Sequence, residues 1–222
     1  MNEFVDLFSG TDPSNVSTSV RLLLLLTVFS LAPSIVILLT SFTRIIVVLS
    51  FVRTSLATQQ MPPNQVLIGI ALFLTFFIMA PTFNQVNEEA LTPLFNEEIT
   101  LDEAYDRASI PLKEFMAEHT RQKDLALFLD YNQLEAPDSI EDISLTTLVP
   151  AFAISELKTA FQMGFMIFIP FLVIDMAVAS VLMSMGMMML PPVMISLPFK
   201  ILLFVLVDGW YLITQSLLQG FS

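Results

Sequence analysis

Long stretches without charged residues constrain this chain more than any other feature. Two stretches, residues 22–43 and 66–83, carry no charged residue. Two further apolar stretches carry very few: residues 161–182 contain one acid, and residues 199–218 contain one acid and one lysine. A helix of about 20 residues is roughly 30 Å long, which matches the hydrocarbon core of a bilayer. The sequence therefore predicts an all-α, polytopic integral membrane protein with about four hydrophobic helices in kinked or hairpin pairs.

Composition agrees with this prediction. The 222 residues are 55% hydrophobic and 14% charged, whereas soluble domains are about 25% charged. The net charge of −12 argues against nucleic-acid binding, which needs basic patches. Cysteine is absent and histidine occurs once, at position 119, so we expect no metal and no cofactor.

Nearly all of the negative charge lies in one segment. Residues 84–147 contain 15 acids and 4 bases and so carry −11 of the total. Thr100 to Glu103 fits a capping box, and Pro111 is expected in the first turn of a second helix. The segment is predicted to be a helical, water-exposed domain on the exterior side of the membrane.

Four regions follow from these patterns. They are a polar N-terminal tail, a first hydrophobic helical pair, the acidic domain and a second hydrophobic pair, at residues 1–19, 20–83, 84–147 and 148–222. Consecutive prolines break the first pair at Met61 to Asn64 and the second within residues 183–198. The first apolar run lacks a basic leader and is long for a signal peptide, so we expect it to be a span.

Methionine is concentrated around the second break. Nine of the 13 methionines lie between Met163 and Met194, and Met187, Met188 and Met189 are consecutive. Methionine is flexible and polarizable and fills irregular gaps, which favours a packing role. The alternative is that several subunits project the triple into a central hole, where it forms a soft apolar seal against ions.

A few charges lie in the apolar blocks, where an unpaired charge is costly. Asp175 and Asp208 are expected to be buried charges, with Lys200 nearby. They fit either an ion or proton relay or ion pairs formed with each other or with a neighbouring subunit. Glu156 and Lys158 are two residues apart, so on a helix they point to different sides.

No phosphate loop, catalytic triad or metal-ligand spacing occurs in the chain, so we expect no enzyme. An ion-conducting channel or transporter that uses Asp175 and Asp208 is the alternative from another functional class.

Three long stretches resemble the FliP family of type III export-gate proteins. They are Phe42-Thr43-Arg44-Ile45 with Pro62-Pro63-Asn64-Gln65, Ser155–Gln162 with Phe168–Asp175, and Met185–Pro192 with Leu197–Lys200 and Val207–Trp210.

The resemblance implies a function, partners and sites. Family members assemble in several copies with FliQ and FliR as a helical, cone-like gate in the basal body. The chain would then be a core pore-forming subunit that conducts unfolded flagellar proteins through the inner membrane. Met187–Met189 align with a gating gasket, and Arg121, Glu156 and Lys200 match positions proposed to pair between subunits. A gate of a virulence-type secretion system shares this architecture and is the nearest alternative.

Overall fold

The structure is a computed structural model of the chain. It describes residues 23, 26–27, 30, 34–35, 37–58, 60–134, 137, 139–187 and 189–221. The chain divides into two compact units, Met1–Leu38 and Leu39–Ser222. The described residues up to Leu38 are helical. The predicted polar tail at 1–19, and most of the predicted span at 22–43, lie outside the described residues.

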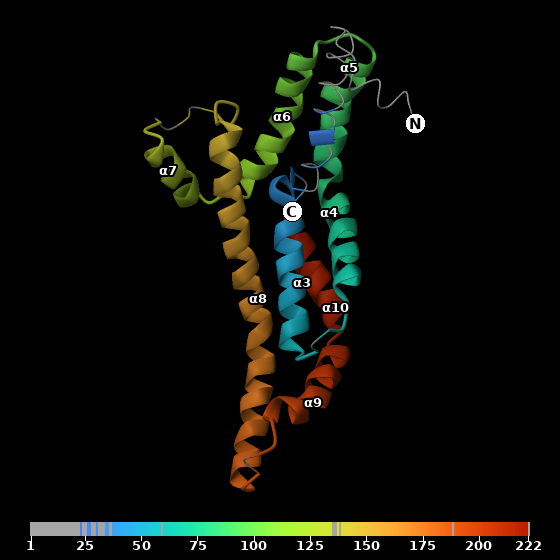
Figure 1. Cartoon of the computed structure of the whole chain (residues 1–222), viewed down its shortest axis with the longest axis vertical. Helices are drawn as coiled ribbons and strands as arrows, with labels where there is room; N and C mark the ends of the chain where they lie inside the picture. The colour runs from blue at the N-terminus through green and yellow to red at the C-terminus, as the bar shows by residue number, and fades with distance from the viewer. Residues whose placement is uncertain are drawn as a thin grey trace, which may run out of the picture. The chain divides into compact units, whose positions relative to one another are not determined.

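All regular elements of the second unit, over its described residues, are helices. In chain order they are α3 (Phe42–Ser55), α4 (Asn64–Val86), η1 (Asn87–Leu91), α5 (Thr92–Phe95), α6 (Leu101–Glu118), α7 (Gln122–Tyr131), α8 (Leu145–Ser184), α9 (Pro192–Leu206) and α10 (Gly209–Gln219). Figure 1 shows α3 between the long helix α8 and α4, with α6 and α7 near the beginning of α8 and α9 near its end. The predicted all-helical class is confirmed for this unit.

The first core forms where α3 packs on α8. Ile45, Val48, Leu49 and Val52 recur at helical spacing on one face of α3 and are fully or almost fully buried. Gly164 of α8 permits the close approach, because a Cβ there would lie 2.4 Å from the ring of Phe51.

A second core joins the acidic segment to the rest of the unit. Its buried members are Met79, Phe115, Met116, Ile143, Leu148 and Phe152. The predicted capping box is confirmed, since Thr100 and Glu103 bond each other's backbone at the start of α6. The predicted helix start at Pro111 is wrong, because Pro111 lies inside α6. Pro111 is itself buried, as are Phe115 and Met116 one turn later, and this packing offsets the backbone hydrogen bond that proline removes.

Two helices are long and apolar enough to cross a membrane. One is the continuous run Asn64–Phe95, formed by α4, η1 and α5, and the other is α8. They contain the predicted spans 66–83 and 161–182, but both are longer than expected. The predicted boundary between residues 83 and 84 therefore falls inside a continuous helical run.

The predicted span at 199–218 is found as two helices. Only together are α9 and α10 long and apolar enough to cross a membrane. The axes of the two helices are bent by 62° at Val207 and Asp208. Asp208 has the left-handed backbone conformation, with φ 53°. The part of the chain that the structure describes thus holds two candidate spans, or three if the bent pair counts as one.

Candidate functional site

A buried ion pair joins α3 to α8. The Nε of Arg44 donates to Oε2 of Glu156 at 2.8 Å, and its Nη2 bonds the other carboxylate oxygen. Glu156 is fully buried and Arg44 nearly so. The two parallel bonds are the geometry in which a guanidinium binds a carboxylate most strongly. Glu156 was predicted as a site residue, but Arg44 was not identified as its partner within the chain.

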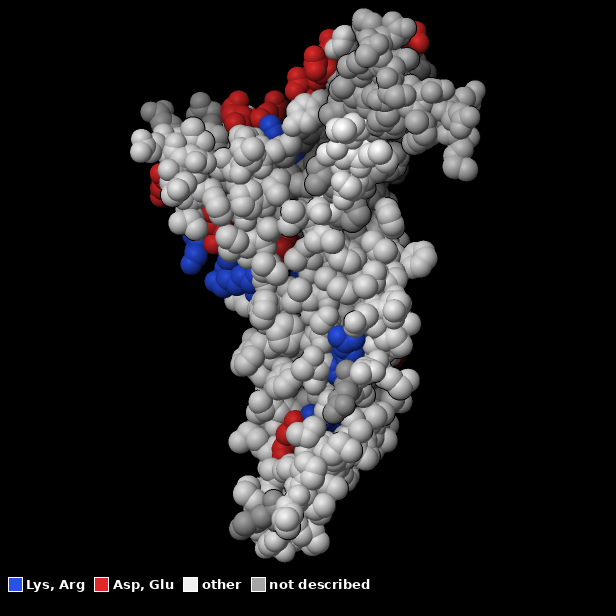
Figure 2. All heavy atoms as spheres, viewed as in Figure 1, with Lys and Arg blue, Asp and Glu red and all other residues white. Residues whose placement is uncertain are grey.

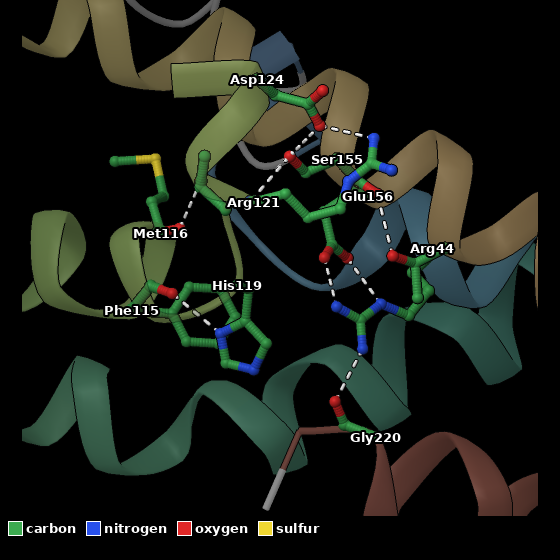
Figure 3. Close-up of polar contacts among 11 residues, drawn as sticks. Arg44, Phe115, Met116, His119, Arg121, Asp124, Ser155, Glu156 and Gly220 are labelled. Atoms are coloured by element: carbon green, nitrogen blue, oxygen red, sulfur yellow. Dashed lines mark hydrogen bonds and ion pairs between the residues drawn. The ribbon is translucent and has the colours of Figure 1, made fainter. Parts of the chain in front are cut away.

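The same arginine holds the end of the chain. Its Nη1 donates to the Gly220 carbonyl at 2.7 Å, and the guanidinium carbon lies 3.8 Å from the centre of the Phe221 ring. Phe221 also stacks on Phe115, with 6.2 Å between the ring centres. Figure 3 shows Arg44 placed between Glu156 and Gly220, near Phe115 of α6 and near His119, which directly follows that helix. Arg44 therefore connects three segments that are far apart in the sequence.

A second polar network lies one residue away on α8. Ser155 donates to Oδ2 of Asp124 at 2.7 Å, and Arg121 bonds the same oxygen. The backbone N–H of Arg121 donates to the Ser155 hydroxyl at 3.1 Å, so the network is closed between α7 and α8 (Figure 3).

Asp124 is held as a carboxylate by this network. Burial by itself raises the pKa of the Asp124 carboxyl, but hydrogen bonds from Ser155 and Arg121 outweigh it. The net result is a pKa below the ordinary value. Asp124 and Ser155 were not predicted as site residues, because the local sequence pattern does not show that α7 packs against α8.

A third network lies farther along α8. Lys200 of α9 donates to Oδ2 of Asp175 at 2.6 Å and to the Ser55 carbonyl at 3.1 Å. Ser196 donates to the other oxygen of Asp175 at 2.5 Å. Lys200 is 1% exposed and Asp175 is half-buried. Of the two alternatives for these charges, pairing between Asp175 and Lys200 is therefore what the single chain forms.

The other predicted site residues are exposed. Asp208 was expected to be buried, but it lies on the surface of the single chain, because the bend between α9 and α10 turns it outward. Met187 and Met189 are 45% and 98% exposed at the turn between α8 and α9. Met188 lies outside the described residues. Lys158 is exposed while Glu156 is buried, which confirms that they point to different sides of α8.

Charge is distributed unevenly over the surface. Figure 2 shows acidic side chains gathered where α6 and α7 lie, whereas the rest of this face is mostly uncharged and carries only small, separate patches of basic or acidic side chains. An apolar groove of about 680 Å³ lies between α8 and the bent pair, with Met166, Phe171, Phe204 and Ile213 among its lining residues.

These networks hold helices together and present no catalytic arrangement. Among the residues that the structure describes, no three carboxylate or imidazole groups lie close enough to hold a metal ion. The features that could contact another molecule are an apolar surface and a methionine-rich turn, while most charged groups of the apolar helices are paired within the chain.

Comparison with known proteins gives a consistent result. The FliP family model matches residues 25–217. A Bacillus subtilis (strain 168) protein named flagellar biosynthetic protein FliP is 76% identical over 221 residues, which cover 100% of both chains. Proteins of the same name from Caulobacter vibrioides and Aquifex aeolicus are 52% and 50% identical. The Caulobacter match covers 98% of this chain and 82% of the relative, and the Aquifex match covers 94% of this chain and 88% of the relative.

Proposed function

This chain belongs to the FliP family of flagellar biosynthetic export-apparatus proteins, and on that premise we propose that it is a core pore-forming subunit of the flagellar type III export gate. In this role it conducts unfolded flagellar proteins across the cell membrane. Other components supply the energy, and the chain itself catalyses no reaction. The relatives with flagellar names favour this role over the virulence-type gate.

The turn between α8 and α9 is the observation that carries the proposal. Met183, Met185, Met187, Met189 and Met194 are each at least 45% exposed there. One chain leaves these flexible, apolar side chains with little to pack against. If several copies place this turn around one axis, the side chains meet, close the opening against ions and yield to a passing chain.

The apolar surface supports an assembly in the inner membrane. We infer a homo-oligomer that associates with FliQ and FliR subunits and other export-apparatus components in the flagellar basal body. The run Asn64–Phe95 and α8 are suited by length and composition to a membrane, and much of the α8 surface stays exposed in one chain.

Arg121, Glu156 and Lys200 were predicted to pair between subunits. Within one chain they pair with Asp124, Arg44 and Asp175. Arg121 is the member best placed for an additional partner, because its side chain is 30% exposed whereas those of Glu156 and Lys200 are almost fully buried. For Glu156 and Lys200, pairing between subunits requires an exchange of partners and stays a prediction.

The gasket is tested by changing Met187, Met188 and Met189 together to alanine in the complete complex. We expect the complex to assemble in wild-type amounts but to leak ions, because alanine leaves the opening unfilled. Flux from potassium-loaded vesicles that contain the purified complex measures the leak.

A matched control changes three methionines of α8, namely Met163, Met166 and Met176, which lie outside the turn. These variants should stay ion-tight if the turn forms the seal. A turn variant that assembles, exports and holds its potassium gradient would refute the gasket.

A further inference from the structure

The bend between α9 and α10 presents an unused carboxylate. Asp208 precedes α10 at the position where an aspartate commonly caps a helix, yet its side chain makes no capping bond. Its backbone has the left-handed conformation instead of the extended one that is usual for a capping residue. The bend itself is tightly packed, since a Cβ at Gly209 would lie 2.3 Å from the ring of Phe204. Asp208 is thus held outward on an apolar surface.

Most other charges of the apolar helices are satisfied. Arg44 and Glu156 form one pair, and Lys200 and Asp175 form another. Over the described part of the chain, the backbone of Asp208 is hydrogen-bonded to Val205 and Leu212, but its carboxylate makes no hydrogen bond or ion pair. An isolated carboxylate among apolar groups at membrane depth is costly, so a cation from another chain would remove a substantial penalty.

Arg53 of α3 is a cation with unused bonding capacity. Its Nη1 bonds the Asn64 side chain and the Pro62 carbonyl, and among the described residues it meets no carboxylate. Nε and Nη2 are left for a further partner, and together they form an edge that binds a carboxylate through two parallel bonds.

Contacts with α8 place Arg53 and Asp208 at the same level along this helix. Phe51 packs on Gly164, so Arg53, about half a turn later on a helix that runs parallel to α8, lies near the level of Met166. Val207 and Gly209, which flank Asp208, line the same groove as Met166 and Ile167. Lys158, an exposed cation on α8, lies eight residues before Met166, or roughly 12 Å away along the helix.

We propose that Asp208 of one subunit pairs with Arg53 of the next copy in the assembly. This inference rests on the proposed oligomeric gate. If the copies are arranged around an axis parallel to α8, residues at the same height along α8 lie at the same height in neighbouring copies. A head-to-tail contact between two different patches can then repeat from each copy to the next. The pair would make Asp208 an interface residue and the bend of α9 and α10 a subunit contact.

Crosslinking tests the proposal in the complete complex. The chain has no cysteine, so Arg53→Cys and Asp208→Cys can be introduced into it without background. We expect a short bis-maleimide to give dimers and higher multimers of the double variant. Each single variant should give no dimer, because like positions do not meet. The matched control is Lys158→Cys with Asp208→Cys, which should crosslink at least tenfold less.

Charge exchange gives a second, independent measurement. Asp208→Arg and Arg53→Asp should each lower the yield of assembled complex at least tenfold, and the two together should restore it. Crosslinks only within one chain, only to another protein, or from Lys158 rather than Arg53 would overturn the pairing. A wild-type chain that purifies as a monomer with its partners present would instead overturn the proposed function. A wild-type oligomer in which neither test succeeds would reject this inference alone.

Discussion

The beginning and the end of α8 differ in how one chain completes them. Near Glu156 the helix is covered by α3, and its charged group has a partner inside the same chain. Near Met183 the helix leaves its neighbours, and the turn to α9 exposes large apolar side chains. Two parts of one helix therefore have opposite surroundings.

The difference separates stability from assembly. The region around Arg44 and Glu156, which we call the packed end, has close contacts and paired polar groups. One chain supplies all of these contacts by itself. The region from Met183 to Met194, which we call the methionine turn, has few contacts that a mutation could break. Substitutions should accordingly destabilise the fold at the packed end and change function at the methionine turn.

The largest expected effect follows Glu156→Gln. It leaves the Arg44 cation buried without a counter-charge, and breaking such a pair by removing one partner costs about 3–5 kcal/mol. Thermal unfolding of the purified protein in mild detergent should show a much lower midpoint. Lys158→Gln, two residues away and exposed, should have little effect. A stable Gln variant that fails only to assemble would mean that Glu156 pairs between subunits instead.

A smaller effect is expected at the contact between α3 and α8. Gly164→Ala places a methyl group against the Phe51 ring and should cost about 1–3 kcal/mol through overpacking. Gly69→Ala is the control, because a Cβ there meets nothing within 4 Å, and alanine should favour the helix by about 0.5–1 kcal/mol. The same unfolding measurement compares them, and equal midpoints would contradict the close packing.

The smallest effect should appear at Asp124 and depend on pH. Its folded pKa is lowered, so its contribution to stability is complete above the unfolded pKa of about 3.9 and is lost as the pH falls through the folded value. Asp124→Asn should therefore cost about 1 kcal/mol at neutral pH.

Unfolding of wild type and variant between pH 7 and pH 2 checks this. The two curves should converge in acid, since the wild-type carboxyl is then neutral as well. A difference that stays constant down to pH 2 would show that the charge of Asp124 contributes nothing.

Local patterns predicted many of the helices and some of their ends. The capping box at Thr100 lies within four consecutive residues, so it could be recognised without the fold. Pro111 misled the prediction, because its place inside α6 depends on burial against residues from other helices. The bend at Asp208 was missed for a similar reason, since Phe204 and Gly209 set it by direct contact.

The sequence by itself determined the helical class, the long apolar spans, the position of the acidic segment and the membership of a family. These depend on periodicity, composition and short motifs, which act over a few residues. Tertiary structure alone decided that Glu156 meets Arg44 over 112 residues of chain and that Lys200 meets Asp175. It also decided that Asp208 faces outward. Partner choice depends on which helix faces pack together, and that is settled by burial over the whole unit.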